Sequence, residues 1–400
     1  MLINGPVNVV RLEGEINGIK KLLYVFFDYH INLREQTECE SYDSKDIVTY
    51  LYKTFKSSTK PLDFFFEVKS MEIGKHRIMP FKNIYISNIS KFYNKSKFDD
   101  STKKNIKSNV RFHYLDIRDY LEKNIYYFND LLDMHITNII KNKDIFSNDY
   151  NNIFDACTQL LYDLAIYKNF FENDINKKLS RSNTKDTKVT KVTKNTTPKY
   201  DILYFLNKIT KKYKNKDIIN KVKKNYFSDI LEKINSCIIH LNEIKSLILE
   251  KESYVYRYYD EKNKFVEKTD NTIAYNLYTN RATMNQFIYK LDNLNDNVQM
   301  EILYIFMKIT DLFFLRRFLD KDYVTNAISY TGAAHSINYI NFLVANFDFK
   351  ITHFSYSEEK NLEKLNNIAK NDLHRLDYIL HPQKLIQCSD LSSFPTDDFN

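Results

Sequence analysis

The hydrophobic positions of this chain follow two different periods, and the change between them divides the sequence into three parts. Near both ends, short runs of apolar and aromatic residues alternate with segments whose apolar residues recur every three or four positions. The first pattern is typical of strands and the second of amphipathic helices, so both ends predict strands that alternate with helices. The strand pattern occurs in Leu22–Phe27, Leu62–Phe66, Val110–Leu115, Asn326–Thr331 and Lys350–Phe354.

The middle of the chain has only the helical period. Apolar residues such as Ile302, Ile305 and Ile309 lie three or four positions apart, which puts them on one face of a helix. We therefore predict an α/β fold, with a mostly parallel central sheet and flanking helices, interrupted by a large all-helical insertion. The predicted parts are an N-terminal α/β half (1–120), the helical insertion (121–325) and a C-terminal α/β half that completes the sheet (326–400).

Positive charge is concentrated in one segment of the predicted insertion. The formal net charge of the chain is +8, and residues 177–199 supply eight basic residues and one acidic residue, a net of +7. This segment is rich in Lys, Thr, Ser and Asn and cannot bury enough apolar surface to fold, so we predict a disordered loop. A flexible arm that contacts nucleic acid is one interpretation, and a solvated linker is the interpretation that we favour.

Composition excludes several classes of function. The chain has 5 glycines in 400 residues, and none of them has the spacing of a P-loop or a dinucleotide-binding turn. The four cysteines are too far apart for a zinc knuckle, and we expect them to be reduced thiols. No apolar stretch reaches the roughly 20 residues of a transmembrane helix, and the N-terminus lacks the order of a signal peptide. We expect an intracellular protein, in a host cytoplasm or a virion, because the composition is typical of the A+T-rich genes of large DNA viruses.

Polar residues able to bind a metal or transfer a proton follow four of the predicted strands. In the order of those strands they are Asp28 and His30, Glu67, Asp116 and Arg118, and His335. Ligands bind at the carboxyl ends of the strands in an open parallel sheet, so these residues form the candidate site. For any single one of them, a helix cap or a hydrogen-bonded loop residue is the alternative interpretation.

The turn at Gly332 is the most informative single segment. It lies between a predicted strand and an amphipathic helix that opens with His335 and Ser336, and no other glycine follows Gly74. Glycine at such a turn lets a ligand approach the backbone or allows a positive φ, and the free N–H groups of the helix favour an anion. A close packing contact between strand and helix is the alternative.

This segment, SYTGAAHSINYINFLVANFDFKITHFS, resembles the second G-x-x-H motif of the TraB/TIKI/ChaN-like hydrolase superfamily, which is related to the erythromycin-esterase-like fold. The first motif of that superfamily lies at the end of the first strand. This chain has Phe27-Asp28-Tyr29-His30 there, with phenylalanine in place of glycine. Glu67 matches the acidic residue that the superfamily has after the next strand. The resemblance covers about residues 20–120 and 326–356.

The resemblance implies a metal-dependent peptidase or esterase. His30, Glu67 and His335 would then be metal ligands or proton carriers, with Glu67 alternatively the general base on a water. Arg118 would orient a carboxylate or stabilise an oxyanion. Nitrogen and oxygen ligands without sulfur admit zinc, manganese or cobalt equally. The residues that would contact the substrate are Asp28, Asp116, Gly332 and Ser336.

The phenylalanine at position 27 leaves a second, non-enzymatic interpretation open. Its side chain would crowd the space that a metal or substrate needs. The chain would then be an inactive relative with a structural, virion-associated or host-interaction role, and its partner would be a protein or peptide. Nucleic-acid binding by residues 177–199 is a third interpretation, which we do not favour.

Overall fold

The computed structural model describes residues 1–29, 35–69, 84–98, 109–117, 125–142, 147–176, 202–211, 213–261 and 281–400. The predicted basic loop at 177–199 lies outside these residues. The chain divides into two compact units. Unit 1 comprises Met1–Ile117, Tyr213–Ile218 and Thr310–Asn400, and unit 2 comprises Arg118–Lys212 and Ile219–Ile309.

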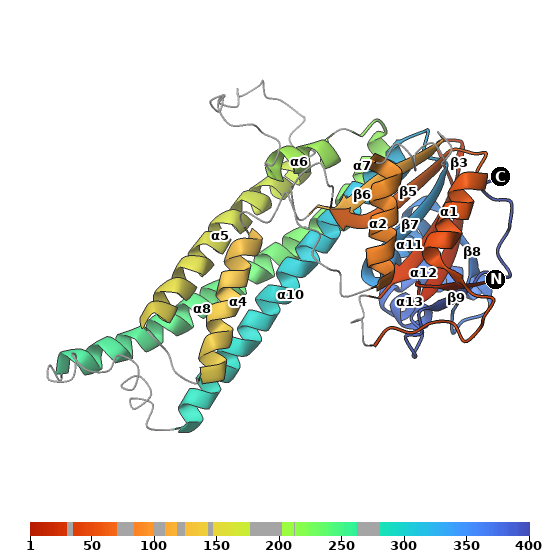
Figure 1. Cartoon of the computed structure of the whole chain (residues 1–400). Coiled ribbons are helices and arrows are strands. Elements are labelled where there is room, and N and C mark those ends of the chain that lie inside the picture. The colour runs from red at the N-terminus through yellow and green to blue at the C-terminus, as the bar shows by residue number, and fades with distance from the viewer. Residues whose placement is uncertain are drawn as a thin grey trace, which may run out of the picture. The chain divides into compact units, whose positions relative to one another are not determined.

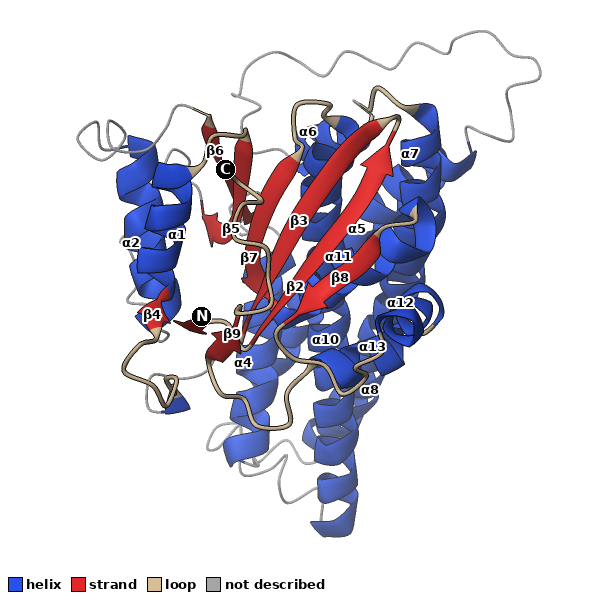
Figure 2. Cartoon of the chain, turned by 90° about the vertical axis from the view of Figure 1, so that its right-hand side faces the viewer, coloured by secondary structure: helices blue, strands red, loops and turns tan. Residues whose placement is uncertain are grey.

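Unit 1 is a mixed α/β structure built on a six-stranded sheet with the order β6-β5-β7-β3-β2-β8 (Figure 2). Its strands are β2 (Asn8–Ile16), β3 (Ile19–Asp28), β5 (Leu62–Lys69), β6 (Val110–Asp116), β7 (Asn326–Gly332) and β8 (Lys350–Phe354). The four strands from β6 to β3 are parallel to one another. The predicted α/β class and mostly parallel sheet are therefore confirmed, with all five predicted strands in this sheet.

One side of the sheet is antiparallel, because β2 pairs antiparallel with both β3 and β8. A two-residue turn, Asn17-Gly18, joins β2 to β3, and both residues have positive φ, 53° and 79°. This is the turn that matches the right-handed twist of a hairpin, and Asn-Gly is its preferred sequence. The strand β2 therefore has a local signal that the hydrophobic pattern alone does not provide.

Helices cover both faces of this sheet. On one face, α1 (Ile47–Ser57) and α2 (Ile84–Phe98) pack on Phe26, Phe64 and Phe66. On the other face, α11 (Ala333–Phe347) contacts β2, β3, β7 and β8, and α12 (Leu362–Asn371) and α13 (Leu373–Leu380) pack on α11. The continuous burial of the run from Lys21 to Asp28 follows from this arrangement, because each face of β3 meets apolar side chains.

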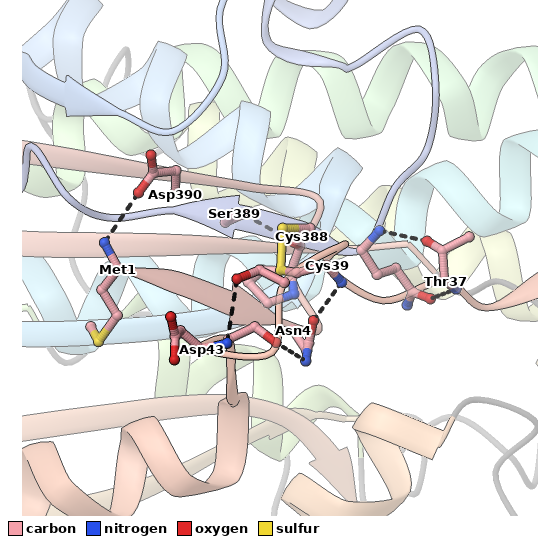
Figure 3. Close-up of a disulfide and its surroundings, with 12 residues drawn as sticks. Met1, Asn4, Thr37, Cys39, Asp43, Cys388, Ser389 and Asp390 are labelled. Carbon is pink, nitrogen blue, oxygen red and sulfur yellow. Dashed lines mark hydrogen bonds and ion pairs between the residues drawn. A yellow bond between two sulfur atoms is a disulfide. The ribbon is translucent and has the colours of Figure 1, made fainter.

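A small second sheet joins the two ends of the chain. It has the order β4-β1-β9 and consists of β1 (Leu2–Asn4), β4 (Lys45–Asp46) and β9 (Cys388–Asp390). A disulfide links Cys39 to Cys388 beside it, with 4.9 Å between the two Cα atoms (Figure 3). The expectation that all four cysteines are reduced is therefore wrong for this pair. Cys157 and Cys237 are free and buried.

The described elements that lie wholly in unit 2 are helices (Figure 1). They are α4 (Tyr127–Asn142), α5 (Ser147–Asn176), α6 (Ile202–Thr210), a π-helical turn (Lys223–Phe227) and α8 (Ser228–Glu261). Helices α7 (Lys216–Val222) and α10 (Arg281–Asp320) have residues in both units. Within the described part of the chain, no helix is both long enough and apolar enough to cross a membrane.

Candidate functional site

Two of the predicted polar groups, Glu67 and His335, lie near the carboxyl ends of parallel strands of unit 1. Strand β5 carries Glu67 and is a direct neighbour of β7, which ends at Gly332, one turn before His335. The backbone N–H of Gly332 donates a hydrogen bond of 2.8 Å to Glu67 Oε2. This contact fixes the carboxylate of Glu67 at the point where β7 ends and α11 begins.

His335 lies between two carboxylates. Its Nδ1 atom is 2.6 Å from Asp311 Oδ1, and its Nε2 atom is 3.7 Å from Glu67 Oε1. Asn338, one helical turn later on α11, donates a hydrogen bond of 2.9 Å to the other oxygen of Asp311. The side chain of His335 is 12% exposed and that of Glu67 is 20% exposed, whereas Asp311 is fully buried. Glu67, His335 and Asp311 thus form a row, and solvent reaches it on the Nε2 side of His335 and not on the side of Asp311.

These contacts determine the protonation of His335. Burial by itself lowers the pKa of the imidazole, but the negative charges of Glu67 and Asp311 outweigh it and raise the pKa to about 9. The carboxylate of Asp116, at the end of β6, acts in the same direction. His335 is therefore a cation at neutral pH, held by one hydrogen bond to a buried carboxylate and facing a second carboxylate.

The turn at Gly332 lacks one of the two features that were predicted for it. Its φ is −52°, so a positive φ is not the reason for glycine at this position. Ser336, a predicted substrate contact, is fully buried, and its hydroxyl lies 3.1 Å from the hydroxyl of Thr331 and donates to the Thr331 carbonyl. That side chain holds the start of α11 against β7 and offers no surface to a substrate.

The remaining predicted residues do not all join this group. Asp28 accepts a hydrogen bond of 3.2 Å from Tyr330, whose ring belongs to the core under α1 and α2. Since side chains alternate along a strand, Asp28 shares the face of Phe26 and not the face of Phe27. Phe27 itself is fully buried, with its ring edge-on to His381 at 6.2 Å. The predicted residues His30 and Arg118 lie outside the described residues.

Asp311 is the functional residue that sequence reasoning missed. It lies on α10 within the apolar stretch from Ile302 to Leu315. In the sequence, its charge indicates only that this stretch is not a transmembrane helix. A carboxylate on the buried face of an apolar helix needs a partner, because an unpaired buried charge is strongly destabilising. A charged residue at an apolar position of the helix was therefore the signal for a buried ion pair, but the sequence does not identify His335 as the partner.

Comparison with known proteins places the chain in a family. The model of a family of unknown function, DUF5847, matches residues 1–400. The chain belongs to this family. It is 35% identical to "Uncharacterized protein R706" of Acanthamoeba polyphaga mimivirus over 98% of its length and 96% of the relative. Two further mimivirus proteins, "Uncharacterized protein R161" and "Uncharacterized protein R160", are 31% and 32% identical over 98% of the chain and 97% and 96% of their own lengths. No solved structure matches the chain. These relatives are viral, as the composition predicted.

In this DUF5847 chain, the site is suited to proton transfer. A histidine that is protonated at neutral pH can donate its Nε2 proton, and the partly exposed carboxylate of Glu67 beside it can accept one. For metal binding, Glu67 and His335 are the two predicted ligands that lie together. Among the residues that the structure describes, no group of three or more His, Cys, Asp or Glu side chains is arranged to hold a metal ion. Binding of a zinc, manganese or cobalt ion stays a prediction, and it requires a further ligand beside Glu67 and His335.

Proposed function

We propose that the chain is a hydrolase whose acid–base pair is His335 and Glu67, with Asp311 as the residue that positions and charges the histidine. The observation that carries this proposal is the row of Glu67, His335 and Asp311, in which the imidazole faces a carboxylate on each side. Such rows support general acid–base chemistry because the buried carboxylate fixes the tautomer and keeps the proton on the ring.

In the proposed reaction, water attacks an ester or amide carbonyl of the substrate. Glu67 accepts the proton of the attacking water, and His335 donates its Nε2 proton to the leaving oxygen or nitrogen. The distance of 3.7 Å between Glu67 Oε1 and His335 Nε2 then allows the proton to return directly from the carboxylate to the imidazole. The resemblance to the TraB/TIKI-like and erythromycin-esterase-like hydrolases supports the same reaction class. The divalent ion that the resemblance implies belongs to the proposal only if a third ligand joins Glu67 and His335.

The test is hydrolysis by the purified full-length chain of a panel of chromogenic esters and fluorogenic peptides, with and without added zinc, manganese or cobalt. We expect His335→Gln and Glu67→Gln each to lower the rate by about 100-fold or more, the usual contribution of a general acid or base. His374→Gln is the matched control, because His374 is an exposed histidine of unit 1 on α13. Equal rates in the wild type, His335→Gln and Glu67→Gln would contradict the proposal.

A second candidate is the catalytically inactive relative with a structural, virion-associated or host-interaction role. The observation that favours it is Phe27, which takes the place of the glycine in the first motif and is fully buried against His381. Under this alternative, the wild type hydrolyses no member of the panel and the predicted ion does not bind. The same assay, with metal analysis of the purified chain, separates the two candidates. The interpretation of unit 2 as a helical insertion into the α/β fold belongs to the proposal in either case.

A further inference from the structure

A second charged cluster lies at the edge strand β6, away from the row of His335. The guanidinium of Arg111 donates to both oxygens of Asp63, at 2.7 Å and 2.5 Å, and also to the carbonyl of Tyr323 at 2.7 Å. The ring of His113 adds a third contact to Asp63, at 2.7 Å from Nε2 to Oδ1. Asp63 is fully buried, and its negative charge is paired with Arg111 and His113.

Arg317, on α10, brings a further positive charge to this cluster. Its guanidinium carbon lies 3.9 Å from the centre of the Phe313 ring, one helical turn earlier. Its Nη1 atom is buried and donates to no acceptor among the residues that the structure describes. Within the described part of the chain, no carboxylate forms an ion pair with it, and burial lowers the pKa of its guanidinium.

The residues near Arg317 are those whose pKa it changes, or whose charge changes its own pKa. Burial lowers the pKa of His113, and the positive charges of Arg317 and Arg111 act in the same direction. Tyr114 and Tyr323 are close enough to Arg317 to act on its pKa in return. The groups around Arg317 therefore include the ring of His113, the guanidinium of Arg316 and several tyrosine rings, and the nearby carboxylate of Asp63 is already paired.

A buried guanidinium N–H without an acceptor is unfavourable, and an unsatisfied buried group in a native protein usually indicates a bound ion or water. We propose that Arg317 is the centre of a binding site for a phosphate-type oxyanion, between β6 and the last turns of α10. A guanidinium binds two oxygens of such an anion side by side, and the charge of Arg317, unlike that of Arg111, is not offset by a carboxylate of the described residues. This site does not depend on the proposed hydrolase activity.

The experiment measures the melting temperature of the full-length chain against inorganic phosphate, with ionic strength held constant by chloride. We expect a saturable rise in the wild type, and at least a tenfold weaker apparent affinity in Arg317→Met. Without phosphate, Arg317→Met should melt above the wild type, because the substitution removes a buried N–H that has no acceptor among the described residues. Arg317→Gln is the second variant, for the case in which Arg317→Met does not fold.

The matched control is Lys308→Met, a buried cation on the same helix that is paired with Asp229 at 3.5 Å. It should keep the phosphate response of the wild type. An identical phosphate response in the wild type and in both Arg317 variants would overturn the proposal. A larger response to succinate than to phosphate would overturn the assignment of a tetrahedral anion.

Discussion

The two carboxylates beside His335 make the stability of unit 1 depend on pH in a defined direction. The pKa of His335 is about 9 in the folded chain, against an ordinary value of 6.5. The folded state therefore holds an extra proton between these two pH values. The stabilisation is fully present below pH 6.5 and is lost as pH rises through 9.

The size of this effect follows from the two pKa values. The difference between 6.5 and about 9, at about 1.36 kcal/mol for each tenfold change in proton affinity, corresponds to about 3 kcal/mol. Solvent screening reduces this figure little, since the side chain of His335 is 12% exposed and Asp311 is fully buried. We expect His335→Gln to lack this contribution at every pH.

Urea unfolding followed by circular dichroism measures the effect, because the chain has no tryptophan for fluorescence. The free energy of unfolding of the wild type, relative to His335→Gln, should fall by about 3 kcal/mol between pH 6 and pH 10. A chelator in all samples prevents divalent ions from competing for Nε2. His374→Gln is the control, and its pH profile should follow that of the wild type. Parallel profiles for the wild type and His335→Gln would refute the coupling of His335 to Glu67 and Asp311.

Two further predictions concern stability away from the site. In Gly14→Ala, the new Cβ would lie 2.5 Å from ring carbons of Phe349, so we expect a loss of about 1–3 kcal/mol in urea unfolding, partly recovered in the double variant with Phe349→Leu. Failure of the second substitution to recover any stability would show that the clash is not the cause. In Cys39→Ser, loss of the disulfide should lower the free energy of unfolding by about 2–5 kcal/mol under oxidising conditions. With a reducing agent the wild type and Cys39→Ser should unfold alike, and a difference that persists there would contradict the role of the disulfide.

Local patterns in the sequence were sufficient for five of the six strands of the main sheet in unit 1. The apolar run Leu22–Phe27 is part of β3, and the run Leu62–Phe66 is part of β5. A signal for the hairpin of β2 and β3 was also present, in Asn17-Gly18, because those two residues adopt the positive φ that the turn needs. Such patterns are readable because their cause, the alternation of faces or the geometry of a turn, acts within one element.

The candidate site was readable only in part. The order of strands and helices placed Glu67 and His335 at the ends of parallel strands. Only the structure shows that these strands, β5 and β7, are neighbours and that the two side chains lie within 3.7 Å. Ser336 follows the same rule in sequence and yet is buried against Thr331. Position at a strand end therefore places a residue near the site, but the packing of α11 decides which side chains face solvent.

The sequence by itself determined the periods of the strands and helices, the polar groups at the strand ends and the exclusion of P-loop and dinucleotide-binding turns. Only the tertiary structure decided that Asp311 pairs with His335 and that Cys39 joins Cys388, across 349 positions. The physical reason is that a hydrophobic period records how one element meets the core. An ion pair or a disulfide depends on which elements pack together, and that choice is made by the sum of many contacts along the whole chain.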